Sequence, residues 1–161
     1  MGTIANQLIE LKNALTAWAV TEKGTVYIAP DLNKMYHTGL TDSQTPRCVI
    51  AYVGEDIRGD LGSAQEARVD RQFEVMVNAG IGYTVNRGDN LVQPTDETRR
   101  PFYDLVEEAR DTIRFYRMND TDSEWPIDYR STRPVFVNDY PINAYIISFS
   151  IGTQLIRPEI A

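Results

Sequence analysis

The sequence is poor in the residues that carry catalysis or bind metal ions. Its 161 residues include one cysteine, Cys48, and one histidine, His37. One cysteine cannot form an internal disulfide, and zinc sites and nucleophile–base pairs need more such side chains than these two. Cys48 lies in an apolar run and is expected to be a buried hydrophobic residue, whereas His37 is expected in a surface loop. We therefore expect no enzyme activity, no metal and no cofactor.

The chain also lacks long apolar runs and an excess of positive charge. Its longest apolar run extends from Cys48 to Val53, far short of the roughly 20 residues that span a bilayer. No membrane anchor is expected. There are 16 basic and 23 acidic residues, which gives a formal net charge of −7. Proteins that hold nucleic acid normally carry a basic surface for the phosphates, so stable DNA binding is not expected.

Three short motifs resemble functional sites, but the sequence around them does not match what such sites require. Gly80-Ile81-Gly82 lacks the third glycine of a dinucleotide loop, because Val85 stands in its place. The acidic residues of 120–124 lack both the glycine and the final glutamate of a calcium loop. Arg-Gly-Asp occurs at 58–60 and again at 87–89, where glycine and aspartate favour turns. None of the three predicts a ligand site.

Apolar residues at helical spacing predict two main helices. The first covers about 3–18, with Thr3 as its N-cap, and its apolar face consists of Ile4, Leu8, Leu11, Leu15 and Trp18. The second covers 101–118 and begins at Pro101, a residue that suits the first turn of a helix. Acidic residues early in this segment and arginines late in it match the helix dipole.

The remaining apolar segments predict four or five strands. Cys48–Val53 has no polar alternation, which is typical of a central strand covered on both faces. Alternation over 69–79 predicts a half-buried strand, and Pro134 places the strand at 130–137 at a sheet edge. The other strands are expected at 25–29 and 143–154. Between them, 30–46 is polar and irregular, with room for a single helical turn around Leu32, Met35 and Tyr36.

Together these elements predict one α+β domain over residues 1–161. Its four- to five-stranded sheet is mainly antiparallel or mixed, and it carries the two helices. Two long connections, 54–68 and 80–100, interrupt the regular elements. Long connections in a compact domain are usually functional or disordered.

In size, element order and charge, the chain resembles the tail terminator family of long-tailed bacteriophages. The first helix (Leu8, Leu11, Leu15), the sheet centre (48–53 with 69–79), the second helix (102–116) and the closing strands (133–137 and 143–153) carry the resemblance.

The resemblance implies a homohexameric ring that caps the tail tube, ends tube polymerisation and presents the surface for head–tail joining. The implied partners are further copies of the chain, the tail tube protein and the head connector or stopper protein. DNA would pass the lumen without specific binding. The implied location is the neck of the virion, with assembly in the host cytoplasm, and no catalytic residue is implied.

Two alternatives remain open. Another neck ring component, such as a head-completion or stopper protein, would share the ring and the composition. A cytoplasmic ligand-binding module would instead be a monomer with one apolar pocket.

The two long connections are the predicted assembly interface, because both are charged and rich in glycine. Charges of both signs on neighbouring copies can pair head-to-tail and fix their register. The other place for such an interface is the sheet edge at 130–137. The predicted interface residues are Arg58, Asp60, Glu66, Arg68, Arg87, Asp89, Arg99 and Arg100.

Overall fold

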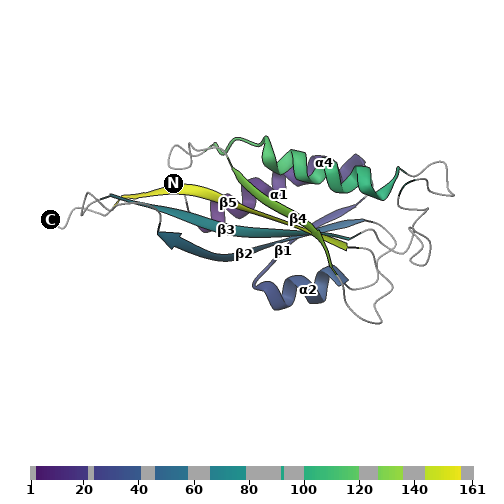
Figure 1. Ribbon diagram of the computed structural model, residues 1–161, viewed down its shortest axis with the longest axis horizontal. Helices are drawn as coiled ribbons and strands as arrows, with labels where there is room; N and C mark the ends of the chain where they lie inside the picture. The colour runs from purple at the N-terminus through teal and green to yellow at the C-terminus, as the bar shows by residue number, and fades with distance from the viewer. Residues whose placement is uncertain are drawn as a thin grey trace.

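The computed structural model (Figure 1) describes residues 3–21, 24–40, 46–57, 66–78, 92, 100–119, 127–135 and 144–156. In these residues, helices cover both faces of a five-stranded mixed sheet, which confirms the α+β class. In chain order the elements are α1 (Ile4–Thr21), β1 (Thr25–Ala29), α2 (Leu32–Leu40), β2 (Arg47–Ile57), β3 (Glu66–Asn78), α4 (Phe102–Arg114), β4 (Asp128–Pro134) and β5 (Ala144–Ile156).

The strand order across the sheet is β1-β2-β3-β5-β4. β1 runs parallel to β2, and the other neighbours are antiparallel. β3 is the middle strand. The predicted strand at 48–53 belongs to β2, an interior strand between β1 and β3, and its residues 48–51 are fully buried, as expected of a strand covered on both faces. The edge position predicted from Pro134 is correct, because β4 borders the sheet on one side and β1 borders it on the other.

The first helix begins where the sequence places it and ends three residues later than expected, at Thr21. Thr3 caps it, since its hydroxyl accepts a 3.1 Å hydrogen bond from the amide of Asn6. Gly24 then turns the chain into β1. Its amide donates to the Ala19 carbonyl at 2.6 Å. A Cβ at this position would lie 2.6 Å from the Pro46 carbonyl oxygen, so the close approach requires glycine.

The second predicted helix is shorter than expected. Pro101 occupies the N-cap and α4 ends at Arg114, with Phe115 as the C-cap. Tyr116 and Met118, assigned to the helix from their spacing, lie beyond it. The reason is a contact with α1: the carboxylate of Glu10 accepts hydrogen bonds from the Tyr116 hydroxyl at 3.2 Å and the Asn119 amide at 2.8 Å. This contact draws the chain off the helix axis.

The larger core lies between the sheet and the pair α1 and α4. The rings of Phe73 on β3 and Phe149 on β5 stack there with centroids 5.8 Å apart. Trp18 of α1 donates its indole N–H to the Leu105 carbonyl of α4 at 3.1 Å, which links the two helices. Residues from both helices and from β2, β3 and β5 complete this core, among them Leu11, Leu15, Cys48, Ile50, Val75, Val77, Phe102, Ala109, Ile113, Ile147 and Ile151.

A second, smaller core lies on the opposite face, under α2 (Figure 1). Met35 of α2 is fully buried there, in a cluster with residues of β1, β2, β3 and β5: Ala29, Val49, Ala51, Met76, Ala144 and Ile146. The expectation of a single helical turn at 32–36 is wrong, because α2 has nine residues. The Asp31 carboxylate caps it by accepting from the Lys34 amide at 2.8 Å. Around Met76, β3 is consequently covered on both faces rather than half-buried.

The predicted loop at 54–68 is largely strand at both ends. β2 continues to Ile57 and β3 begins at Glu66, with their register shifted by a bulge between Tyr52 and Gly54. Gly54 has φ +155°, a conformation that other residues rarely adopt. β3 and β5 run out past the helices toward the C-terminus (Figure 1).

Candidate assembly interface

The predicted interface residues fall into two groups. Arg58, Asp60, Arg87, Asp89 and Arg99 lie outside the described residues. Glu66, Arg68 and Arg100 lie within them. Glu66 is the first residue of β3 and pairs in register with Ile156. Neither Glu66 nor Arg68 is a loop residue, so this part of the predicted interface belongs to the sheet.

Arg68 lies flat on the sheet. Its guanidinium covers Gly152 of β5, where a Cβ would come within 2.9 Å of an Arg68 nitrogen. Its Nε lies 4.0 Å from the carboxylate of Asp70, and about a third of its side chain is exposed. Because Gly152 has no side chain, the Arg68 guanidinium can lie directly over it. This geometry favours a role within the fold over a role at a loop tip.

Arg100 also makes an intramolecular contact. Its Nη1 lies 2.6 Å from the Glu108 carboxylate, so it ties the start of α4 to the second turn. Both side chains are well exposed, and an exposed pair of this kind contributes about 0–1 kcal/mol. Arg100 is accessible to a partner only in competition with Glu108.

A buried polar cluster joins the N-terminal part of α1 to the sheet. Gln7 is fully buried, donates to the Thr153 hydroxyl at 2.7 Å and accepts from the Arg71 guanidinium at 3.2 Å. Arg71 also forms an ion pair with Glu55 across the β2–β3 ladder at 3.2 Å. Such satisfied buried groups fix the position of one element on another. This cluster holds α1 in register over β2, β3 and β5.

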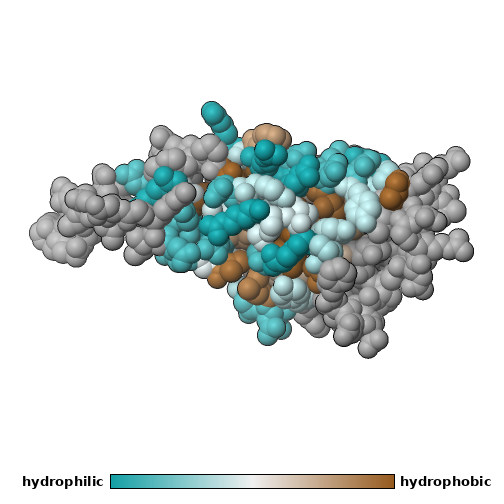
Figure 2. Space-filling model, in the orientation of Figure 1, coloured by the Kyte–Doolittle hydropathy of each residue, from teal (hydrophilic) through white to brown (hydrophobic). Residues whose placement is uncertain are grey.

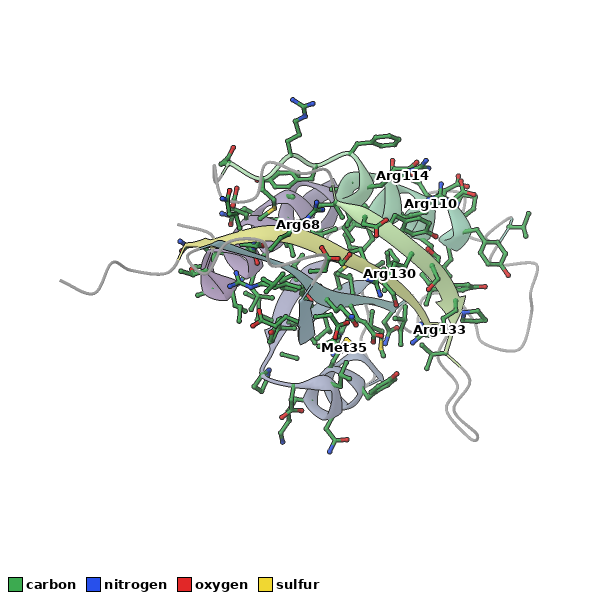
Figure 3. All side chains as sticks on the ribbon, turned by 60° about the vertical axis from the view of Figure 1, so that its left-hand side comes forward. Met35, Arg68, Arg110, Arg114, Arg130 and Arg133 are labelled. Carbon is green, nitrogen blue, oxygen red and sulfur yellow. The ribbon has the colours of Figure 1, made fainter. Side chains whose placement is uncertain are left out.

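Arginines gather on the β4 side of the molecule. Figure 3 shows Arg110 and Arg114 on α4 and Arg130 and Arg133 on β4. Arg130 is exposed at the bulge in β4 and makes no ion pair among the described residues. Arg133, about half exposed, reaches Glu74 at 3.4 Å and the Ser148 hydroxyl at 3.2 Å. The face over β4 is mainly hydrophilic (Figure 2).

The β4 edge has the features that prevent strand addition. Charged side chains, a bulge and proline each discourage another strand from pairing with a sheet edge. β4 has a bulge between Tyr129 and Ser131 and ends at Pro134. Its charged residues are Asp128, Arg130 and Arg133.

At the opposite edge, β1 lacks these features. β1 has the sequence Thr-Val-Tyr-Ile-Ala, without charge or proline, and its Tyr27 and Ile28 are 43% and 38% exposed. β1 covers β2 only as far as Ala51. Beyond that point β2 itself borders the sheet, with Val53, Glu55 and Asp56 exposed. Asp56 accepts a hydrogen bond from the Gln72 amide on β3.

The sequence predicted only part of this arrangement. Pro134 identified the β4 edge. Glu55 and Asp56 lie within the predicted connection 54–68, and Arg130 and Arg133 lie within the alternative edge 130–137, but none of the four was among the eight named interface residues. All four residues lie on one of two opposite sheet edges. Which strands form these edges depends on the strand order, and the strand order cannot be determined from the sequence of a single strand.

Groups capable of chemistry are scarce in the described structure. Cys48 is fully buried, and this burial raises the pKa of its thiol, which disfavours the reactive thiolate. His37 lies on α2 rather than in the expected loop. Burial, with a hydrogen bond to Tyr103, raises the pKa of Tyr145 to about 12. Within the described ranges, no three acidic, histidine or cysteine side chains lie close enough to hold a metal ion.

Two comparisons of the sequence with known proteins give no match. The sequence matches no protein-family model, and no curated protein shows significant similarity to it. Among the helices that the structure describes, none combines the length and the apolar character needed to cross a membrane.

Proposed function

We propose that the protein is a non-catalytic structural subunit that forms a ring, most simply a hexamer, on the end of a bacteriophage tail tube. The ring ends tube polymerisation and presents the surface for head–tail joining. Its partners are its own copies, the tail tube protein and the head connector or stopper protein. Its place is the neck of the virion.

The observation that carries the assembly role is the pair of unlike edges on one sheet. Soluble proteins normally protect an edge strand against pairing, and β4 has such protection whereas β1 does not. The edges are separated by the full width of five strands, about 19 Å at the usual strand spacing. Two different surfaces on opposite sides of a subunit are what a head-to-tail ring requires.

The tail terminator assignment rests on the resemblance in element order and size. From α1 to β5, the two main helices and five strands follow one another in the predicted order, and α2 is an additional helix. An acidic chain is compatible with a lumen through which DNA slides without being held.

The direct test is a capping assay with a polymerising tail tube protein. We expect substoichiometric amounts of the protein to shorten the tubes, and electron microscopy to show a ring at one tube end. The Ile113→Asp variant, whose fold we expect to fail, is the control. Unchanged tube lengths together with binding to the head connector would indicate a stopper protein instead. Unchanged lengths with a monomeric protein would contradict both ring functions.

A further inference from the structure

The two sheet edges differ in the hydrogen-bonding groups that they present. Beyond Ala51 the β1–β2 edge carries two exposed carboxylates, Glu55 and Asp56. The β4 edge carries two arginines, Arg130 and Arg133, against one carboxylate, Asp128, and arginine offers five N–H donors that match carboxylates. One edge is therefore rich in acceptors and the other in donors.

We propose that neighbouring subunits meet edge to edge, with the β1–β2 edge of one copy against the β4 edge of the next. Glu55 and Asp56 of one copy then face Arg130 and Arg133 of the neighbour. This inference rests on the proposed ring and names the surfaces that close it. Because the two surfaces are different, each copy uses both, and the contact can continue around a ring.

The internal contacts of Asp56 and Arg130 leave both side chains able to pair with a neighbouring copy. Arg130 is exposed and has no ion pair among the described residues. Within the described ranges, the Asp56 carboxylate accepts one hydrogen bond, from the Gln72 side-chain amide, and a carboxylate can accept several. Asp56 and Arg130 are thus the two positions where a charge reversal disturbs the contact and spares the monomer.

The uncharged β1 strand supplies the rest of the contact. Tyr27 and Ile28 are partly exposed on the same edge, opposite Val49 and Ile50 of β2, and their burial adds apolar area to a charged rim, as in other protein interfaces. Pro134 and the bulge in β4 prevent a continuous ladder between the copies. Side chains, more than backbone pairing, would therefore hold the two edges together.

Two single reversals, Asp56→Arg and Arg130→Glu, test the contact. Each places like charges at every interface of a ring, and we expect each to weaken one interface about fivefold, the scale of an exposed ion pair. The loss multiplies around the ring. Lys34→Glu is the matched control for Arg130→Glu, since it makes the same change of charge at an exposed residue of α2. Ring mass is measured by native mass spectrometry at low salt, and circular dichroism checks each fold.

Mixing the two variants gives the sharper result. In a ring where the variants alternate, every interface again pairs opposite charges, either Arg130 with Asp56 or their reversed counterparts. We expect each variant alone to dissociate and the equimolar mixture to form rings that contain equal numbers of both. Rings that form equally well in every variant, or a mixture that restores nothing, would overturn the edge contact alone. A wild-type chain that stays monomeric would overturn the ring itself.

Discussion

The packing of α4 on the sheet gives a prediction with a matched control on the same helix end. Ile113 is 1% exposed in the larger core, whereas Phe115, two residues later, is 71% exposed. Replacing Ile113 with Asp removes about 1.5–3 kcal/mol of apolar burial. It also places a carboxylate where it has no partner, at a cost of several kcal/mol. The expected loss is most of the roughly 5–15 kcal/mol that stabilises a domain.

Phe115→Asp adds the same charge at the same end of α4. It loses only the contact between the Phe115 ring and the Arg114 guanidinium, 5.2 Å from its centroid, worth about 0.5–1 kcal/mol at an exposed site. The repulsion by the helix dipole is common to both variants, at about 0.3–1 kcal/mol. Urea unfolding followed by circular dichroism compares the two. If Ile113→Asp were as stable as the wild type, or Phe115→Asp as damaging as Ile113→Asp, the assigned core face of α4 would be wrong.

Three further changes probe other parts of the fold. Gln7→Ala leaves the buried guanidinium of Arg71 without one acceptor, and we expect a loss of about 1–3 kcal/mol in urea unfolding; an unchanged midpoint would show that the cluster does not hold α1. Ser150 has a buried hydroxyl with no hydrogen-bond partner in the part of the chain that the structure describes, so Ser150→Ala should raise the thermal midpoint or leave it unchanged. A clear drop would point to a partner outside that part. Cys48 is fully buried with a raised thiol pKa, so a thiol reagent at pH 8 should react only after unfolding, and rapid reaction of the native protein would contradict its place in the core.

Helical and strand periodicity predicted most of the core, because the core residues of each helix or strand lie on one regularly spaced face. The apolar stripes of α1 and α4 and the alternation in β3 all lie where the sequence put them. α2 was missed because only Leu32, Met35 and Tyr36 identify its buried side. Its packing against the second face of the sheet stabilises it. That face is made by β1, β2, β3 and β5, of which β3 and β5 are distant from α2 in the sequence.

The strand ends at 54–57 and 66–68 were missed for a related reason. Their charged residues resemble a solvated loop when each segment is considered alone. In the ladder, Glu55 lies opposite Arg71 and forms an ion pair with it. Cross-strand pairing of this kind stabilises polar strands, and the partner is visible only once the register is known.

The candidate interface shows the same limit. Glycine and charge content indicated the two long connections, of which Arg68 and Arg100 have contacts within their own chain. The alternative at the 130–137 edge was indicated by Pro134 alone. Arg130 and Asp56 lie on opposite edges because the strand order is β1-β2-β3-β5-β4, and this order was not part of the prediction.

The mass of the assembled wild-type protein tests the central claim most directly. Native mass spectrometry of the purified chain, over a hundredfold range of concentration, should show one closed species at about six times the 18.3 kDa chain mass. Negative-stain images of the same sample should show a ring with an open centre. A single 18.3 kDa species at every concentration would contradict the account, because a monomer can neither enclose a lumen nor cap a tube.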